Sequence, residues 1–371
     1  MTPLILLTLA SAPPTADAST DFFKAAGPVL TLRIEVDKEN LAALIKDGRK
    51  TVHAALHWNS QSLDDLGLHL KGAAGSRRDW GDKPALTLNS DKFKSGQTFF
   101  SMDKFHLNNS VQDDSYLNEI IFSHLFRTAG VPTARATHAL VELNKRKVGL
   151  YVLKEGYDKT FLSRYYKNVG GNLYDGGFLA DIDQPLQLDS GDGCEHKDLK
   201  ALVAAATIKD HKERLAALDK LLEVDKFFAL WVIEVMGADW DGYSRNRNNY
   251  RMYHDPASGK FTVFAHGKDQ MFQNTGDSLV HGWGGLLARK LWETEDGRKR
   301  YIKTMKEVFE KQFKIADLHQ RIDEYAMRLK DPLNAYQKGR GDQYLEMVKH
   351  YKRRVAARVD YLAKEIPKLK P

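Results

Sequence analysis

The chain has 371 residues, 42% of them hydrophobic and 10% aromatic, which is enough for a sizeable core in one large domain or two lobes. Its net charge of +7 favours anionic partners such as phosphates, but the basic residues form no helix-turn-helix, RNA-binding or zinc-finger pattern, and nucleic acid is not expected. No run of about 20 apolar residues is present, so no transmembrane anchor is predicted, and a single cysteine excludes an internal disulfide.

The chain begins with a short apolar block, LILLTLASA, followed by PPTADAS. The block is too short to span a bilayer, and its Ala16-Asp17-Ala18 ending fits a small-x-small cleavage site, although no Lys or Arg precedes it. We therefore expect residues 1–18 to be a signal peptide and the protein to be exported to the periplasm, cell envelope or extracellular space. The alternative is an apolar N-terminus that is simply frayed.

Strand patterns dominate the first part of the chain. Alternating apolar residues predict strands in VLTLRIEV, TVHAALHW, LGLHLKG, PALTLNSDKF and DKFHLNN. Between the first two, DKENLAALIKDG predicts a short helix capped by Asp37. The first strong helix is predicted in DDSYLNEIIFSHLFRTAG, with Asp113 or Asp114 as its cap. HALVELNKRKVGLYVLKEG then predicts a hairpin that turns at Asn144 and Lys145.

From about residue 195 the pattern changes to helices, with apolar residues at helical spacing in HKDLKALVAAA, HKERLAALDKLL, DKFFALWVIEVMGA and three long segments of the C-terminal tail. One hairpin, NNYRMYHDPASGKFTVFAHG, interrupts them and turns at Asp255-Pro256 and Ser258-Gly259. A sheet-rich N-terminal half followed by a helix-rich C-terminal half predicts an α+β chain, with two lobes and a cleft between them.

The stretch ADWDGYSRNRNNYRMYHDPASGKFTVFAHGKDQMF, residues 238–272, carries the polar residues best suited to chemistry. Asp241 is followed five residues later by Asn246, and the hairpin returns the chain to Asp269. In phosphoryl transfer, an aspartate accepts the hydroxyl proton, an asparagine binds the metal on the phosphates, and a second aspartate supplies a hard oxygen ligand. The spacing is also common by chance. An open alternative is that Asp239 and Asp241 cap a turn and the asparagines bond their own backbone.

Six segments are informative when they are compared in order. LHLKGAAGSRRDWGDKPALTLNSDKF is similar to a KG-x-S segment with a following lysine, and SYLNEIIFSHLFRTAGVPTARATHALVELN to a helix with an aGvP turn. GLYVLKEGYDKTFLSRYY and GNLYDGG match GlYvl-E and GNLY, RNNYRMYHDPASGKF matches NNYylY-d, and LARKLWETEDGRKRYIKTM matches a C-terminal helix opening. Through most of residues 65–310 the chain thus resembles the CotH kinase family, the atypical secreted or spore-coat protein kinases.

The resemblance implies a two-lobed atypical protein-kinase-like fold over residues 19–371, with a sheet-rich N-lobe at about 28–155 and a helix-rich C-lobe at about 156–371. It also implies ATP and Mg²⁺ or Mn²⁺ as cofactors. The implied activity is transfer of the γ-phosphate to Ser or Thr of an envelope or coat protein.

Residue roles also follow from the resemblance. Lys83 is the candidate for the α- and β-phosphates, and Glu119 the acid that holds this lysine. The other nucleotide-binding candidates are Ser76, Arg77 and Arg78, in a loop that would cover the phosphates, and Glu155, at the strand that connects the lobes. Ordinary solvated charges are the alternative for each of them.

The resemblance assigns the remaining roles to the stretch 238–272. Asp241 is the candidate catalytic base, with Asp239 as its rival because the register of the loop is open. Asn246 or Asn249 would be the metal amide, and Asp269 the metal carboxylate.

One motif departs from the family. The usual PWDxDxxF is AHGKDQMF in this chain, so Gly267 stands where the first acid is expected. His266 is a poor ligand for Mg²⁺ and a better one for Mn²⁺, and Asp239 or Asp277 could compensate as neighbouring acids. Two functions therefore stay open: an active exported kinase, or a catalytically impaired CotH-like scaffold that acts in envelope or coat assembly or in binding. A polymer-binding module without nucleotide is a third hypothesis, based only on charge and export.

Overall fold

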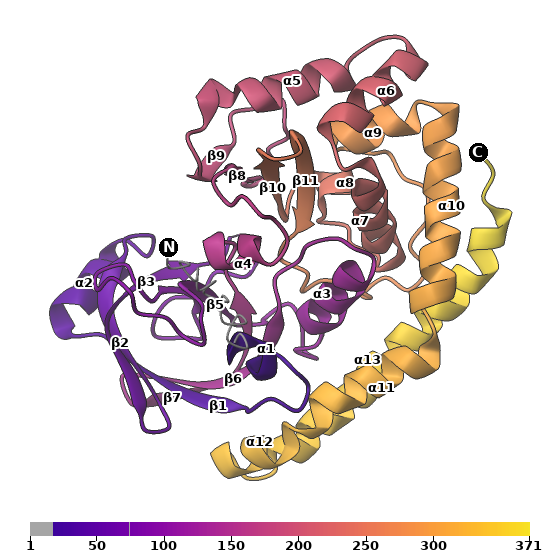
Figure 1. The fold of residues 1–371 in the computed structure, drawn as a ribbon. Coiled ribbons are helices and arrows are strands. Elements are labelled where there is room, and N and C mark those ends of the chain that lie inside the picture. Colours follow the sequence, from indigo (N-terminus) through magenta and orange to yellow (C-terminus); the bar gives the residue numbers. More distant parts are fainter. Residues whose placement is uncertain (1–17, 74) are drawn as a thin grey trace, which may run out of the picture.

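The computed structural model describes residues 18–73 and 75–371, so the predicted signal peptide lies outside the described residues except for its last residue. Strands occupy the first part of the chain and helices most of the second (Figure 1). This arrangement confirms the predicted α+β class. A short helix, α1 (Ala18–Phe22), precedes the first strand, and Phe22 is buried in the core of the strand-rich part.

A closed barrel forms the N-terminal part. Its strands are β1 (Leu30–Glu35), β2 (Val52–Trp58), β3 (Gln61–Lys71), β4 (Ala85–Asn89), β5 (Lys104–Asn108), β6 (Ala136–Leu143) and β7 (Arg146–Glu155). They are ordered β1-β2-β3-β4-β5-β7-β6, and β1 closes the barrel by pairing in parallel with β6. Alternate leucines such as Leu56, Leu68 and Leu88 fill the interior, because successive side chains of a strand face opposite sides.

Two local predictions within the barrel are confirmed. Asp37 caps α2 (Lys38–Lys46) by accepting a hydrogen bond from the Asn40 backbone N–H at 2.8 Å. Asn144 and Lys145 form the turn between β6 and β7, with φ of 47° and 69°. Two consecutive left-handed residues are typical of a two-residue hairpin turn, whose twist matches that of the strands.

The predicted helix after the barrel's fifth strand is α3 (Asn118–Thr128). The expected aspartate cap is wrong in detail, because Leu117 occupies the cap position. Asp113 nevertheless accepts a hydrogen bond from the Asn118 backbone N–H at 2.9 Å from five residues away. The apolar face of α3, which includes Ile121, packs into the core of the helical part rather than into the barrel.

A four-stranded sheet and ten helices follow the barrel. The sheet has the order β11-β10-β8-β9 and consists of β8 (Asn172–Asp175), β9 (Gln187–Ser190), β10 (Tyr250–Asp255) and β11 (Lys260–Ala265). The hairpin β10–β11 was predicted, whereas β8 and β9 were not. The helices are α4 (Lys159–Ser163), α5 (Lys197–Ala206), α6 (His211–Leu221), α7 (Val224–Met236), α8 (Tyr243–Asn246), α9 (Leu286–Trp292), α10 (Glu295–Gln312), α11 (Ile315–Met327), α12 (Lys330–Tyr336) and α13 (Arg340–Glu365).

The C-terminal helices connect both parts of the molecule. Helices α11 to α13 run along one side of it (Figure 1). Tyr336 of α12 donates a hydrogen bond to the Val141 carbonyl of the barrel at 3.0 Å. Arg358 of α13 donates to the Met236 carbonyl at the end of α7 at 2.9 Å. β7 ends at Glu155, where the sequence places the lobe boundary, and the division into two lobes stays a prediction.

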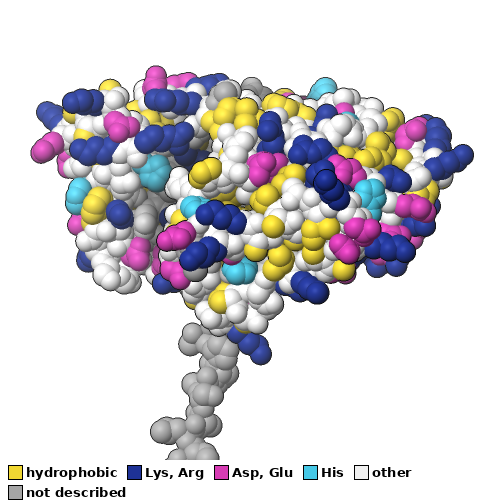
Figure 2. Space-filling model, turned by 90° about the horizontal axis from the view of Figure 1, so that it is seen from above, with side chains coloured by type: hydrophobic (Ala, Val, Ile, Leu, Met, Phe, Trp, Pro, Cys, Tyr) yellow, Lys and Arg dark blue, Asp and Glu magenta, His cyan; other side chains and the backbone are white. Residues whose placement is uncertain are grey.

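The surface carries its positive charge in several places. On the face shown in Figure 2, Lys and Arg side chains lie in separate groups, with acidic and hydrophobic side chains between them. Within residues 18–73 and 75–371, no helix combines the length and the apolar character needed to cross a bilayer.

Candidate active site

A cavity of about 730 Å³ lies between the barrel and the four-stranded sheet. Side chains of β3, β4 and β5 form one wall, and β10 with the loops around residues 241–249 and 266–270 forms the other. Three of the predicted residues, Asp241, Asn249 and Asp269, line this cavity together. The polar residues before and after the hairpin of the stretch 238–272 therefore meet at one cavity.

Asp241 is held by side-chain amides. Its Oδ1 accepts a hydrogen bond from Asn246 Nδ2 at 2.7 Å, and its Oδ2 accepts from Asn248 and Asn249 Nδ2 at 3.0 Å each. The chain can wrap around the carboxylate in this way because Arg247 and Asn249 adopt left-handed backbone conformations. The asparagines thus bond the Asp241 side chain, and Asn246 is not among the described residues that line the cavity.

Asp239 lies beneath the loop and not at the cavity wall. Its side chain is buried, and its Oδ2 accepts from Lys268 Nζ at 2.6 Å. Its Oδ1 accepts from the Asp241 backbone N–H at 3.0 Å, and Lys268 also bonds Glu234 Oε1 at 3.1 Å. Of the two rival aspartates, Asp241 is therefore the one that faces the cavity.

Asp269 presents a carboxylate without a fixed donor. Among the described residues, no other residue donates a hydrogen bond to it, while its backbone carbonyl accepts from Asn118 Nδ2 at 2.9 Å. Burial, together with the charges of Glu119 and Asp113, raises the pKa of Asp269 to about 7. A carboxylate in such an environment is well suited to a cation, because a cation favours the ionised form.

Gly267 and Asn249 lie in direct contact. Gly267 has φ +61°, and a Cβ atom there would lie 2.6 Å from Asn249 Oδ1. Because Asn249 Nδ2 bonds Asp241, the carbonyl oxygen of this amide is turned toward the space that a side chain at 267 would occupy. The missing acid of the motif therefore leaves room for an amide oxygen.

The oxygen donors fit a hard divalent cation only in part. Asn249 Oδ1 and the Asp269 carboxylate are ligands of the type that Mg²⁺ and Mn²⁺ prefer. Within the described part of the chain, no group of three or more His, Cys, Asp or Glu side chains could hold a metal ion. Asp239 and Asp277, the acids that could replace the missing one, are not among the described residues that line the cavity. Asp239 bonds Lys268, and Asp277 bonds Arg245. These residues thus suit a cation that takes its other ligands from phosphate and water.

The barrel wall of the cavity is basic. Lys71, at the end of β3, donates to Asn108 Oδ1 at 2.8 Å, and burial and the charge of Lys154 lower the pKa of Lys71 to about 8. Lys104 of β5 lines the same wall, whereas Arg251 of β10 lies on the opposite wall and pairs with Asp175 and Asp189. Burial and nearby cations lower the pKa of His69 to about 4, and positive charge in such a confined space favours an anionic ligand.

The predicted Glu119–lysine pair forms with a different lysine. Glu119 Oε1 pairs with Lys154 of β7, and both side chains are buried. Lys83 instead donates to Tyr116 Oη at 2.7 Å, and its ammonium group also lies 5.1 Å from the centre of the Tyr151 ring. Lys83 is not among the described residues that line the cavity. The predicted pair of Lys83 with Glu119 is therefore wrong, because Lys83 precedes β4 and packs among tyrosines.

The other nucleotide-binding candidates lie in different places, and not all of them line the cavity. Ser76 lines the cavity, whereas Arg77 lines a small adjoining hollow of about 110 Å³. Arg78 donates to the Gly75 and Arg77 carbonyls within its own turn. The buried Glu155 pairs with Arg135 at 2.8 Å and Arg164 at 2.5 Å, so its contacts tie neighbouring segments together.

Sequence reasoning missed several residues of the cavity wall. Lys71, His106 and Asn108 lie on strands that were predicted, at positions that alternate with buried leucines and phenylalanine. That alternation could have identified them, because polar residues at every second position form one face of a strand.

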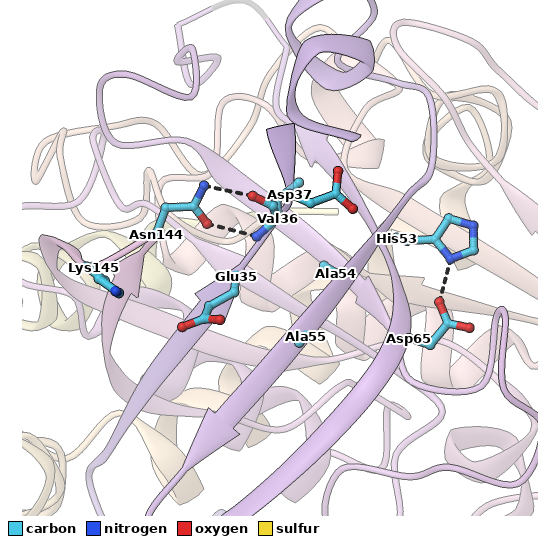
Figure 3. A pocket seen from close by; sticks show the side chains of 9 residues that line it. All are labelled: Glu35, Val36, Asp37, His53, Ala54, Ala55, Asp65, Asn144 and Lys145. Atoms are coloured by element: carbon cyan, nitrogen blue, oxygen red, sulfur yellow. Dashed lines mark hydrogen bonds and ion pairs between the residues drawn. The ribbon is translucent and has the colours of Figure 1, made fainter. Parts of the chain in front are cut away.

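A second hollow, of about 470 Å³, lies on the barrel beside β1, β2 and the Asn144 turn (Figure 3). Its polar groups largely bond one another. His53 pairs with Asp65, and the Asn144 side chain bonds both backbone groups of Val36 at 2.8 and 2.9 Å. These contacts fix the turn against β1.

The model of the family described as CotH kinase protein matches residues 68–366. The chain belongs to the CotH kinase family. This assignment confirms the resemblance drawn from the six segments.

Similar proteins of this family come from fungi and bacteria. Invasin CotH3 of Rhizopus delemar is 25% identical over 190 residues, which cover 46% of this chain and 31% of the invasin. Inner spore coat protein H of Bacillus subtilis is 23% identical over 252 residues, which cover 62% of this chain and 68% of that protein. The CotH family member described here thus matches less than a third of the invasin and about two thirds of the coat protein.

Two solved structures align with a TM-score of 0.38 each. The Helicobacter pylori proinflammatory kinase CtkA is 9% identical, and the alignment covers 81% of this chain and 98% of that one. A chain of the Shewanella oneidensis complex of HipA, HipB and operator DNA is 12% identical, with 93% and 76% covered. A similarity at this level supports no conclusion about fold or activity.

Proposed function

We propose that this CotH family member is an atypical protein kinase with a two-lobed kinase-like fold. It transfers the γ-phosphate of ATP to Ser or Thr of an envelope or coat protein. The observation that supports this proposal is that Asp241, Asn249 and Asp269 line one cavity opposite Lys71. Two hard oxygen donors, a carboxylate for the hydroxyl and a buried ammonium are what phosphoryl transfer requires of a protein.

The cavity would bind the phosphates through charge. Lys71 is the candidate for the α- and β-phosphates in place of Lys83, and Lys104 adds positive charge to the same wall. A bound Mg²⁺ or Mn²⁺ would neutralise charge on the β- and γ-oxygens. Asn249 Oδ1 and the Asp269 carboxylate would hold it from the protein side.

Asp241 would act on the acceptor. Its carboxylate faces the cavity and would orient the Ser or Thr hydroxyl and accept its proton. The three asparagine amides fix the carboxylate in position before the substrate arrives. Pre-organisation of this kind contributes to catalysis because no reorganisation is needed during the reaction.

We also propose that the protein is exported. Its relatives are named as a spore coat protein and as invasins, names that place those proteins at cell or spore surfaces. Residues 1–18 would be the signal peptide that directs export. Expression with and without residues 1–18, followed by cell fractionation, would test this, and cytoplasmic retention of the full chain would contradict it.

A labelling experiment tests the kinase proposal. Residues 19–371 are incubated with γ-labelled ATP and Mn²⁺ or Mg²⁺, and label is followed into the chain itself and into casein. We expect label on Ser or Thr, and a melting temperature that rises when nucleotide and metal are added together. Asp269→Asn should lose both effects, while the matched control Asp65→Asn keeps them. No label and no thermal shift with the wild-type chain would exclude the activity.

The non-catalytic scaffold remains the second candidate. Gly267 favours it, because residues 266–269 carry a single carboxylate, Asp269, where the family motif has two. A scaffold predicts that partner binding survives Asp241→Ala and Asp269→Ala unchanged. The same two variants would abolish labelling if the protein is a kinase.

A further inference from the structure

An exposed aromatic side chain projects into the candidate active-site cavity from the loop between β8 and β9. Phe178 lines this cavity, and 59% of its surface is exposed. Leu179, the next residue, is also exposed. Single exposed apolar residues are common, but two in succession, the first of them at the wall of a polar cavity, call for an explanation.

The loop that carries Phe178 is fixed at both ends. At its start, Gly176 donates to the Tyr250 carbonyl at 3.3 Å, and a Cβ at Gly176 would lie 2.2 Å from the Tyr250 ring. At its end, Tyr250 Oη donates to the Ala180 carbonyl at 2.9 Å. Asp181 then accepts from the Leu286 backbone N–H at 2.7 Å. The tip is therefore held in place by backbone contacts rather than by burial of its own side chains.

The conformation of the tip is also unfavourable for its sequence. Leu179 has φ +58°, in the left-handed region that a bulky non-glycine residue rarely adopts. Backbone strain of this kind is typical of ligand-binding sites, where the surrounding structure maintains it. The residue before it, Phe178, lines the cavity.

A second exposed aromatic ring lies beside Asp241. Trp240 is 47% exposed, and its Nε1 donates to Gln270 Oε1 at 3.0 Å. Gln270 itself lines the cavity. The hydrogen bond therefore ties the exposed indole ring to a residue of the cavity wall.

Both rings are connected to the segment that carries the proposed catalytic residues. Trp240 precedes Asp241, and the Phe178 loop bonds Tyr250, which follows Asn249. The two aromatic rings thus lie on segments that adjoin Asp241 and Asn249.

From this placement we infer that Phe178 and Trp240 form the docking site for the acceptor polypeptide, which carries a large apolar side chain next to its Ser or Thr. The inference rests on the proposed kinase function and names the substrate class of that site. The basic inner wall takes the phosphates, whereas the apolar rim takes the flanking side chain. Burial of that side chain against the two rings fixes the hydroxyl beside Asp241.

A peptide panel tests the inference. Three peptides share one serine and differ in the residues on both sides of it, which are Leu, Lys or Asp. With the wild-type chain we expect kcat/KM for the Leu peptide to be about tenfold higher than for the other two, as expected for one well-buried apolar contact. Phe178→Ser and Trp240→Ser should raise the KM for the Leu peptide and remove the preference.

A thermal-shift measurement and a control variant distinguish failure of the docking site from failure of the proposed kinase function. The nucleotide- and metal-dependent rise in melting temperature reports the proposed ATP site independently of the acceptor. Phe93→Ser, which changes an exposed phenylalanine stacked on His53 of the barrel, is the matched control and should keep the preference.

Transfer to all three peptides without preference, or a preference for the Lys or Asp peptide, would overturn the docking site alone. A Leu preference that survives in both serine variants would also overturn it. No transfer to any peptide would overturn the docking site, and if the thermal shift were missing as well, the proposed function would fail with it.

Discussion

Asp269 combines burial with the lack of a donor from any other described residue, and its pKa is raised to about 7. An aspartate in an unfolded chain has a pKa of about 4. Between these two values the folded chain binds more protons than the unfolded chain, so this residue makes the free energy of unfolding fall as the pH rises from 4 to 7. The same carboxylate is ready to accept a cation once it is ionised.

We therefore expect Asp269→Asn to stabilise the metal-free protein at pH 8 by about 2 kcal/mol, and much less at pH 5. Urea unfolding at both pH values measures the difference. Mn²⁺ with ATP should stabilise the wild-type chain but not the variant. An equal effect of Asp269→Asn at both pH values would contradict the raised pKa.

The contacts of single residues also distinguish Lys71 from Lys83 as candidates for binding the phosphates of ATP. Lys71 lines the cavity, whereas Lys83 contacts Tyr116 and Tyr151. We expect Lys71→Met to lower kcat/KM for ATP by about 100-fold, because one charge-assisted phosphate contact is lost. Lys83→Met should leave the KM for ATP within about twofold, since that side chain does not face the phosphates. The opposite order, measured by steady-state kinetics, would restore the role that the resemblance implies for Lys83.

At the scale of elements, the first turn of α3 holds the backbone around Asp269. Asn118 donates to the Asp269 carbonyl, and Glu119 Oε2 accepts from the Lys268 backbone N–H at 2.9 Å. Lys268 then reaches Glu234 of α7 and Asp239 of the loop. A chain of buried charged groups thus connects the barrel, α3 and the loop that carries Asp241.

Removal of the Lys268 charge should lower the free energy of unfolding. Lys268→Met leaves Glu234 and Asp239 buried with no cation between them, so we expect a loss of about 3–5 kcal/mol in the free energy of unfolding. Adding Asp239→Asn should recover part of the loss, because one uncompensated carboxylate is removed. Urea unfolding of the single and double variants measures both effects. A single variant as stable as the wild type would show that the three groups are not coupled.

Local patterns in the sequence were sufficient for some elements and not for others. The turn at Asn144, the cap at Asp37 and the apolar face of α3 depend on neighbouring residues, and they were predicted. The partner of Glu119 depends on how β7 lies beside α3, which no local pattern contains. The parallel pairing of β1 with β6 and the strands β8 and β9 were missed for the same reason, since pairing over long sequence distances determines them.

The residues of the candidate site could likewise be predicted from the sequence only in part. Asp241, Asn249 and Asp269 could be named because they lie in one continuous stretch that resembles the family motif. Lys71 and Asn108 come from separate strands of the barrel, and only the folded barrel brings them opposite that stretch. Phe178 gave no signal in the sequence, because its exposure results from the fixed ends of its loop.

At the scale of the whole molecule, α13 contacts the end of α7, from which the loop of the candidate active site begins. The buried Arg358 guanidinium donates to the carbonyls of Met236 and Val235 at the end of α7, at 2.9 and 2.8 Å. It also donates to the Asp277 carbonyl at 2.6 Å. A cation at this position stabilises the helix terminus and adds a donor to the carbonyls at its end. The C-terminal helix is therefore part of the scaffold of the loop that begins at Gly237.

We expect Arg358→Met to lower the free energy of unfolding by about 3 kcal/mol, because several buried carbonyls lose their only charged donor. The exposed Arg353 on the same helix is the matched control, and Arg353→Met should change the stability by less than about 0.5 kcal/mol. Thermal unfolding of the two variants measures the contrast. Equal stabilities would show that α13 does not support the loop.

The contact between Gly267 and Asn249 has an evolutionary consequence. An aspartate introduced at 267 would need a left-handed backbone and would place its Cβ 2.6 Å from Asn249 Oδ1. Gly267→Asp alone would therefore displace the Asn249 amide that bonds Asp241. The effect of an acid at 267 thus depends on the residue at 249, and we expect the two positions to be epistatic.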